Sequence, residues 1–159
     1  AAPIGVFPEI EEILERCEIQ AKVTHDTPSA VHAANAAALM SHYIIYDCGS
    51  PEGLADFICQ HVPGTWGAGW NGEVGSRAYM SVRAAIDAVR KGGSLSSVLK
   101  KAISFTGDVD TVAAIAMAAA SCSSSFENDL PSFVYEGLEQ GVYGLEFLKI
   151  LDKNLMPSL

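Results

Sequence analysis

Apolar residues recur at helical spacing along most of the chain, and no long stretch alternates apolar with polar residues as a half-exposed strand would. Between Pro8 and Cys17, isoleucine and leucine share the segment with several glutamates, which predicts an amphipathic surface helix. Pro28 opens a second helical run, dominated by alanine, leucine, isoleucine and methionine, that continues to about Tyr46. Because small side chains allow helices to pack closely, we expect this second helix to be central.

Further helices are expected where the same spacing lies between glycine, proline or serine residues. The predicted ranges are about 51–60, 74–90, 94–105, 111–122, 131–140 and 145–154. Ser94 is the expected N-cap of its helix. Residues 64–72 hold four glycines and both tryptophans, and they are predicted to form a loop. The sequence therefore predicts an all-α fold, a compact orthogonal helical bundle in which residues 1–159 form a single all-α unit.

Composition narrows the classes of partner. The chain has 10 lysine and arginine residues against 19 aspartate and glutamate residues, a net charge of −9. Without a clustered basic face it is not expected to bind nucleic acid. No apolar run reaches the roughly 20 residues of a membrane span, so no membrane association is expected. Four cysteines without a Cys-x-x-Cys spacing argue against a zinc cluster and favour a cytoplasmic location.

The strongest chemical signal is the acidic turn, residues 106–111, directly before the predicted small-residue helix. Taken by themselves, Asp108 and Asp110 could simply cap that helix or interact favourably with its dipole. Together with the hydroxyl of Thr111, however, they supply hard oxygen ligands of the kind that Mg²⁺ or Mn²⁺ prefers. The distal glutamate of a calcium-binding EF-hand loop is missing. The turn therefore predicts half of a metal site, to be completed by water, substrate or ligands from elsewhere.

Two segments resemble a known family. Residues 107–116, Gly-Asp-Val-Asp-Thr followed by Val-Ala-Ala-Ile-Ala, resemble the C-terminal metal motif of the ADP-ribosylglycohydrolases, which reads Gly-Gly-Asp-x-Asp-Thr before an alanine-rich helix. Residues 24–28, Thr-His-Asp-Thr-Pro, are similar to a Thr-His segment of the same family, whose members include the dinitrogenase reductase-activating glycohydrolases. Thr106 stands where the family more often has glycine. Short matches near both ends extend the resemblance over essentially the whole chain.

The resemblance implies a metal-dependent hydrolase that removes ADP-ribose from a modified protein or small molecule with two Mg²⁺ or Mn²⁺ ions. Asp108, Asp110 and Thr111 would then be metal ligands. The family's N-terminal half, with its own acidic metal motif and the carboxylate that assists hydrolysis, has no counterpart in this sequence. We therefore expect the catalytic acid or base to lie outside this chain, on a second chain that supplies the missing half and shares the metals.

The resemblance also directs attention to residues that bind substrate. His25, which by itself could equally be structural, would lie at the ADP-ribose cleft. Trp70 is the first choice for stacking on adenine and Trp66 the second, although burial in the core is the commoner fate of tryptophan. Gly72 and Ser76 would let the backbone approach the ligand.

Two alternatives to a two-part enzyme stay open. One is a catalytically inactive ADP-ribose-binding or structural module of the same fold, like the crystallin-like relatives of the family. The other is an artificial fragment of a single-chain enzyme. The first residues, Ala1 to Gly5, lack an initiator methionine and any targeting character, which is compatible with processing, truncation or division of a longer product.

Overall fold

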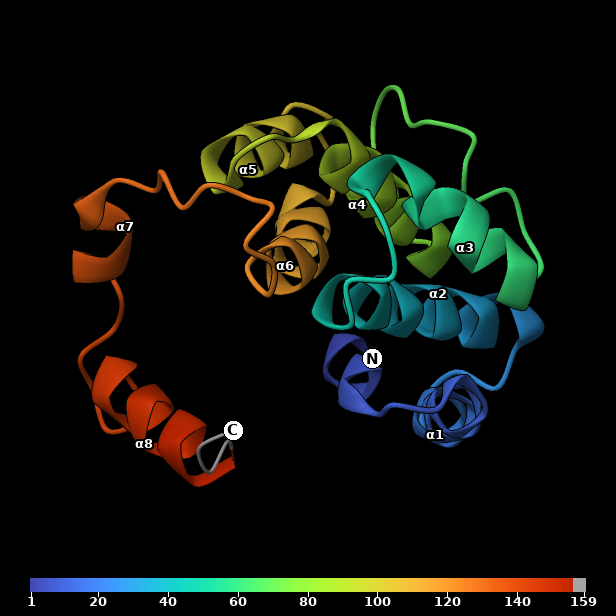
Figure 1. Cartoon of the computed structure of the whole chain (residues 1–159), viewed down its shortest axis with the longest axis horizontal. Helices are drawn as coiled ribbons and strands as arrows, with labels where there is room; N and C mark the ends of the chain where they lie inside the picture. Colours follow the sequence, from blue (N-terminus) through green and yellow to red (C-terminus); the bar gives the residue numbers. More distant parts are fainter. Residues whose placement is uncertain (156–159) are drawn as a thin grey trace. The chain divides into compact units, whose positions relative to one another are not determined.

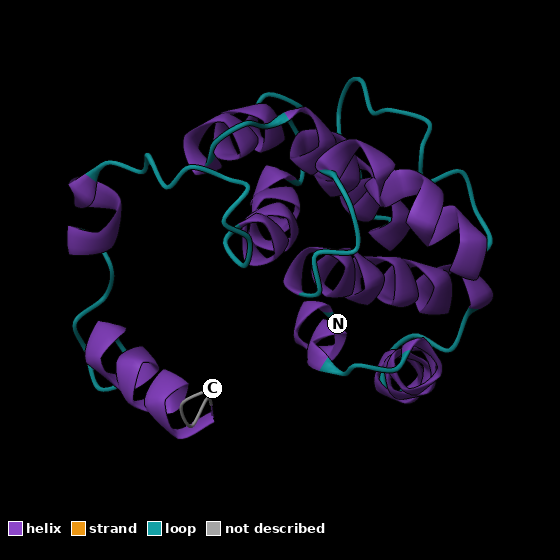
Figure 2. Cartoon of the chain, in the orientation of Figure 1, coloured by secondary structure: helices purple, strands orange, loops and turns teal. Residues whose placement is uncertain are grey.

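Helices make up every regular element of the part that the computed structural model describes, residues 1–155 (Figure 2). The predicted all-α class and helical bundle are therefore confirmed. Contacts within the chain divide it into unit 1, Ala1–Asn128, and unit 2, which begins at Asp129, whereas the sequence predicted a single unit. Over the described residues, no helix combines the length and the hydropathy needed to cross a bilayer.

The order of the elements is shown in Figure 1. Unit 1 contains two short 3-10 helices and six α-helices: η1 (Ala2–Val6), α1 (Ile10–Lys22), α2 (Pro28–Ile45), η2 (Pro51–Gly53), α3 (Leu54–His61), α4 (Ala78–Lys91), α5 (Leu95–Ile103) and α6 (Val109–Ala120). Unit 2 contains α7 (Ser132–Glu136) and α8 (Leu145–Leu155). The predicted helix at 131–140 is thus much shorter in the structure, and the one at 51–60 is divided between η2 and α3.

The alanine-rich helix α2 is the centre of unit 1, as predicted. It packs against η1, α1, α3, α4 and α6, and Figure 1 shows it between α1 on one side and α3 and α4 on the other. Pro28 is its first residue, and the Thr27 hydroxyl accepts a hydrogen bond from the backbone N–H of Ala30 at 3.3 Å. Its small, fully buried residues, such as Ala36 and Ala38, let neighbouring backbones approach closely.

A second set of contacts joins α4, α5 and α6. The helix α4 packs against α2, α5 and α6, and its buried side chains Val82, Ile86 and Val89 recur at helical spacing on one face. Ser94 caps α5 as predicted, through a reciprocal capping box with Ser97. This packing brings the N-terminal ends of α4 and α6 to the same side of α2, where the site described below lies.

The sequence placed the start of α4 too early. Helix was predicted from about Val74, but α4 begins at Ala78, because Val74 pairs instead with the acidic turn. The backbone N–H of Val74 donates to the Thr106 carbonyl at 3.0 Å, and the backbone N–H of Asp108 donates to the Val74 carbonyl at 2.9 Å. A residue whose amide and carbonyl are used in this way cannot also extend the helix.

The glycine-rich segment 64–72 is a loop, as predicted, and α4 holds it in place. Arg83 donates a hydrogen bond from Nη2 to the carbonyl of Ala68 at 2.7 Å, and Arg90 donates from Nη1 to that of Gly67 at 3.3 Å. Trp66 is 4% exposed, and its indole N–H donates to the Val62 carbonyl at 3.1 Å. The loop is therefore fixed by one buried ring and by two arginines of the neighbouring helix.

Candidate functional site

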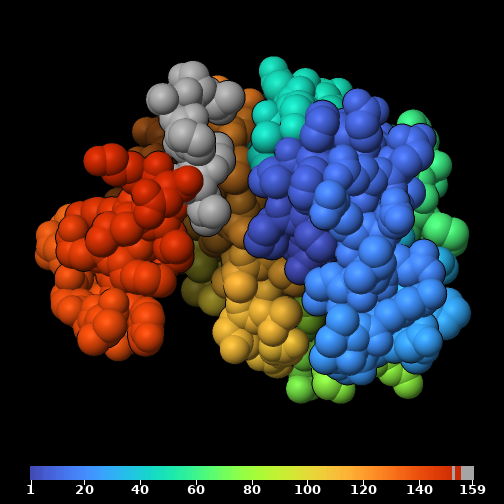
Figure 3. Space-filling model, turned by 90° about the horizontal axis from the view of Figure 1, so that it is seen from below, coloured from blue at the N-terminus to red at the C-terminus, as the bar shows by residue number. Residues whose placement is uncertain are grey.

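A cavity of about 800 Å³ opens in unit 1 among α2, α4 and α6. Its walls come from the start of η1, the end of α1, the segment before α2, the first half of α2, residues 76–82 and the first turns of α6. Figure 3 shows one face of the unit, where α6, in gold, lies beside the N-terminal residues, in blue. The volume is within the range of roughly 300 to 1,000 Å³ typical of small-molecule sites.

The carboxylate of Asp108 lines this cavity with both of its oxygens held. The Thr111 hydroxyl donates to Oδ1 at 2.7 Å, and the Ser81 hydroxyl donates to Oδ2 at 3.3 Å. These hydroxyls belong to different helices, α6 and α4, and Ser81 is only 2% exposed. The carboxylate is therefore oriented by the packing of two helices and not by its own helix alone.

These contacts also shift the titration of Asp108. The pKa of Asp108 is lowered, chiefly by the hydrogen bond from the Thr111 hydroxyl and, to a smaller extent, by the side chains of Asp110 and Ser81 and the backbone of Thr111. Partial desolvation of the carboxylate acts in the opposite direction. The side chain is thus held in its ionised form, which is the form that binds a cation.

The backbone before Asp108 has an unusual conformation. Gly107 has a φ of 77°, and a Cβ at this position would collide with the carbonyl oxygen of Val74. Thr106 also has a positive φ, 66°, which is uncommon for a residue with a branched Cβ. The turn therefore has two residues in left-handed conformations. Gly107 adopts this conformation without strain, whereas Thr106 is strained.

The structure brings together only part of the predicted metal ligands. Asp108 and Thr111 line the cavity, whereas Asp110 is exposed and is not among the lining residues, although it lies close enough to influence the pKa of Asp108. Within residues 1–155, no group of three or more histidine, cysteine, aspartate or glutamate side chains is placed to hold a metal ion. The oxygens present suit Mg²⁺ or Mn²⁺, but they form an incomplete ligand set.

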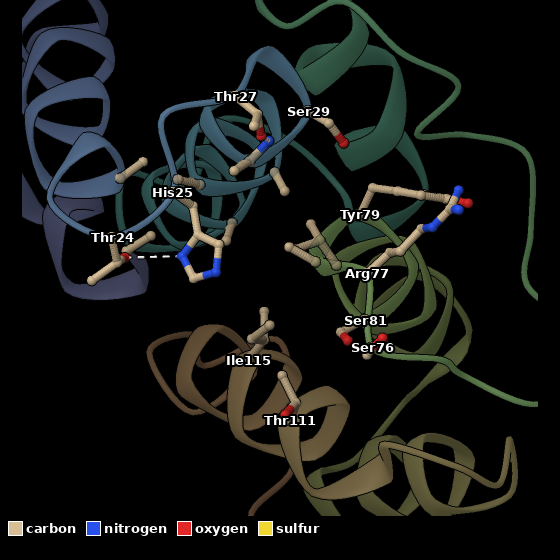
Figure 4. A pocket seen from close by; sticks show the side chains of 18 of the residues that line it. Thr24, His25, Thr27, Ser29, Ser76, Arg77, Tyr79, Ser81, Thr111 and Ile115 are labelled. Atoms are coloured by element: carbon tan, nitrogen blue, oxygen red, sulfur yellow. Dashed lines mark hydrogen bonds between the residues drawn. The ribbon is translucent and has the colours of Figure 1, made fainter.

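His25 and Ser76 line the same cavity as Asp108 and Thr111, and their role in binding a substrate stays a prediction. The ring of His25 shares a hydrogen bond between Nδ1 and the Thr24 hydroxyl at 3.0 Å. Figure 4 shows His25, from the segment before α2, facing the same space as Thr111 and Ile115 of α6. The side chains of the acidic turn and of the Thr-His segment therefore meet, although more than 80 residues separate them in the sequence.

Sequence reasoning missed three lining residues around the start of α4: Arg77, Tyr79 and Ser81. Arg77 is the N-cap residue of α4 and brings a positive charge to the cavity. In Figure 4 the side chains of Arg77 and Tyr79 extend in the same direction, away from His25. Their nearness to Ser76 was a usable signal, but which of them face the cavity depends on how α4 is rotated against its neighbours.

The remaining predicted residues, Trp70 and Gly72, are not among those that line the cavity. The indole N–H of Trp70 donates to the carbonyl of Gly72 at 3.1 Å, and the Arg83 guanidinium lies 5.5 Å from the centre of the Trp70 ring. Stacking of Trp70 on adenine stays a prediction. Trp66, the second choice, lines a smaller neighbouring cavity.

Comparison with protein families identifies the family of the chain. The family model described as ADP-ribosylglycohydrolase matches residues 1–156, a range that includes the Thr-His segment and the acidic turn. A search of curated proteins found no match, and neither did a search of solved structures. The family match covers nearly the whole sequence, so this chain belongs to the ADP-ribosylglycohydrolase family.

Proposed function

We propose that this chain is the C-terminal portion of a metal-dependent hydrolase that removes ADP-ribose from a modified protein or small molecule. The observation that carries the proposal is the oriented pair of Asp108 and Thr111, which opens on the same cavity as His25 and Arg77. Asp108 and Thr111 thus offer oxygen ligands for a divalent cation at the wall formed by α6. His25 and Arg77, on other walls of the same cavity, offer nitrogen donors for an anionic, hydroxyl-rich ligand such as ADP-ribose.

The residues of this chain would divide the work as follows. Asp108, Asp110 and Thr111 would hold the metal, and a bound Mg²⁺ or Mn²⁺ would polarise ribose hydroxyls and activate water. Ser81 holds the carboxylate of Asp108 in its orientation. His25 would hydrogen-bond a ribose hydroxyl or a phosphate oxygen, since either ring nitrogen can take part.

A further role, binding of the diphosphate of ADP-ribose, falls to Arg77. Arg77 is exposed and lines the cavity, so a ligand can reach this residue without rearrangement of the core. Guanidinium groups recognise phosphate oxygens with two parallel hydrogen bonds, which fix orientation as well as charge. We therefore assign Arg77 to the diphosphate and the acidic turn to the ribose whose bond is broken.

The reaction would be hydrolysis of the N- or O-glycosidic bond at C1″ of ADP-ribose. Water adds to C1″, the bond to the leaving nitrogen or oxygen breaks, and a proton passes to that atom. Among the residues that the structure describes, Asp108 is the one aspartate or glutamate that lines the cavity, and as a metal ligand it is ill-suited to be the acid or base as well. The proposal therefore includes a second chain or segment that supplies the remaining metal ligands and the catalytic carboxylate.

The setting proposed for this enzyme is the cytoplasm. All four cysteines are free, and three of them are exposed. Exposed free thiols persist in a reducing compartment, whereas an oxidising one favours their pairing.

The test is reconstitution of the enzyme from this chain and a second chain that corresponds to the N-terminal half of a family member. Asp108→Ala and Thr111→Val should abolish Mg²⁺-dependent release of ADP-ribose, while Asp56→Ala serves as the control for loss of a carboxylate. Asp56 is exposed in the first turn of α3 and lines neither cavity. Undiminished turnover in the Asp108→Ala enzyme would overturn the proposal.

A second candidate function follows from the incomplete ligand set. If this chain acts without a partner, the presence of one carboxylate among the described residues of the cavity favours an inactive ADP-ribose-binding or structural module over an enzyme. Isothermal titration calorimetry separates these possibilities. A binding module should bind ADP-ribose equally well with and without Mg²⁺ and should not gain turnover when the N-terminal half is added. A structural module should bind neither.

A further inference from the structure

A second cavity, of about 320 Å³, adjoins the first. Ser29 and Tyr79 line both cavities, and the other walls of the second are His32 of α2, Arg83 of α4 and residues 63–66 of the glycine-rich loop. We propose that this second cavity binds a phosphate group, either free or carried on a ligand that extends from the first cavity. Only the ligand-borne form of this proposal rests on the proposed function.

The charges of the lining residues favour an anion. Arg83 contributes a permanent positive charge and His32 an imidazole, and in the described part of the chain no aspartate or glutamate lines the cavity. This is unusual for a chain with a net charge of −9. The cavity is therefore a positively charged position on an acidic protein, where electrostatics favour an anion over a cation or a neutral group.

Arg83 has donors to spare. Its Nη2 binds the Ala68 carbonyl, but Nε is buried and has no acceptor among the described residues. No ion pair joins Arg83 to a carboxylate within residues 1–155, and the carboxylate one turn later on the same helix, Asp87, pairs with Lys91 instead. Because a guanidinium has five N–H donors, this arginine can bind an anion without giving up its hold on the loop.

The neutral polar groups of the cavity favour phosphate over a carboxylate. Ser29, Thr65 and Tyr79 bring three hydroxyl groups from three separate segments: the first turn of α2, the loop and α4. Hydroxyl donors from several directions, together with a guanidinium, match the tetrahedral set of oxygens on a phosphate better than the two coplanar oxygens of a carboxylate.

Tyr79 connects this cavity to the proposed ADP-ribose site. In Figure 4 its side chain extends away from His25 and the acidic turn, and it lines the second cavity as well as the first. A ligand that occupies the first cavity can therefore place an additional phosphate beyond Tyr79. The substrate class that this geometry favours is ADP-ribose extended by a phosphate on the side far from the metal ligands.

The test begins with inorganic phosphate and no metal. Calorimetry should show binding to the wild-type chain, and Arg83→Gln should weaken it at least about tenfold because the charged donors are lost. Arg90→Gln is the matched control: Arg90 donates to the Gly67 and Glu52 carbonyls and anchors the same loop, yet it lines neither cavity. It should bind phosphate like the wild type.

Two results would overturn the site. One is absence of phosphate binding by the wild-type chain combined with equal affinity for ADP-ribose and ADP-ribose 2′-phosphate. The other is equal weakening by Arg83→Gln and Arg90→Gln, because the loop and not the cavity would then be responsible. Trp66 gives a local readout, since it lines the cavity and a Trp70→Phe background leaves it as the remaining tryptophan.

A second arm distinguishes the source of the phosphate. A ligand-borne phosphate predicts that ADP-ribose 2′-phosphate binds more tightly than ADP-ribose and that Arg83→Gln removes this difference. If the cavity binds only free phosphate, inorganic phosphate should compete with neither ADP-ribose nor ADP-ribose 2′-phosphate. Asp108→Asn should leave phosphate binding intact, so failure of the metal-dependent reaction and failure of the phosphate site give different results.

Discussion

The buried hydroxyl of Ser81 on α4 donates a hydrogen bond to Asp108 at the start of α6, at 3.3 Å and across 27 residues of sequence. Thr111 occupies the other carboxylate oxygen, so neither oxygen of Asp108 depends on a ligand for its orientation. Groups behind a metal ligand commonly set its orientation and affinity in this way. The geometry of the carboxylate is thus fixed in the chain before any cation binds.

Ser81→Ala should weaken Mg²⁺ binding to the reconstituted enzyme and lower the free energy of unfolding by about 1 kcal/mol, the usual net value of one such hydrogen bond. Calorimetry and urea unfolding measure the two effects. Ser104→Ala is the control, because the Ser104 hydroxyl makes an exposed hydrogen bond to the Lys101 carbonyl at 2.7 Å, outside the cavity. Equal effects of the two substitutions on Mg²⁺ affinity would contradict the orienting role of Ser81.

Thr106→Gly should raise the free energy of unfolding by about 0.5 to 1 kcal/mol. A left-handed φ costs a residue with a Cβ about 1 to 2 kcal/mol, and the greater freedom of glycine in the unfolded chain offsets part of that gain. Chemical denaturation measures the change. Ser104→Gly, at an ordinary φ of −70°, should be destabilising instead. A loss of stability in Thr106→Gly would show that the threonine side chain stabilises the turn.

Asp108 should make stability depend on pH in the acid range. Its pKa in the folded chain is lowered from the ordinary value of 3.8, so its contribution is present above that value and is lost as the pH falls through the lowered pKa. The difference in melting temperature between the wild type and Asp108→Asn should therefore shrink as the pH falls from neutral to about 3. The same substitution at the exposed Asp56 controls for the loss of a surface charge. A difference that grows with acidification would have the wrong sign.

Cys17 should be the least reactive thiol of the folded chain. It is fully buried, its Sγ contacts the Ala34 carbonyl at 3.7 Å, and burial raises its pKa to about 11. At mildly alkaline pH, iodoacetamide should modify the three exposed cysteines in the native chain, and Cys17 as well after denaturation. Peptide mass spectrometry resolves the sites. Labelling of native Cys17 as fast as of Cys122 would contradict its position in the core.

The helices were predictable because their signals are local. Pro28 and Ser94 mark helix starts by the chemistry of the first turn, and the alanine-rich composition of α2 identified the central helix. The start of α4 was not predictable, because Val74 leaves the helical pattern only to pair with a segment more than 30 residues later. Gly107 leaves room for the Val74 carbonyl, but a glycine in the sequence does not tell which distant segment will pair with it.

The site residues show the same difference between what local sequence signals predict and what only the packing of helices determines. Asp108, Thr111 and His25 were found from motifs, Ser76 was chosen from its place after the glycine-rich loop, and all four line one cavity. Arg77 and Tyr79 were not, since their access to the cavity depends on how α4 packs. Composition also could not tell which tryptophan is buried, because Trp66 and Trp70 stand in similar glycine-rich surroundings and only contacts with the helices separate them.

The pairing of Val74 with the acidic turn is made by main-chain atoms, and this affects how the protein tolerates mutation. Changes of side chain at residues 63–66 of the loop can alter the lining of the second cavity without removing these main-chain hydrogen bonds. Gly107 is different, since any side chain there would enter the space of the Val74 carbonyl. Substitutions in the loop can therefore change which ligand the second cavity prefers, whereas position 107 tolerates little change.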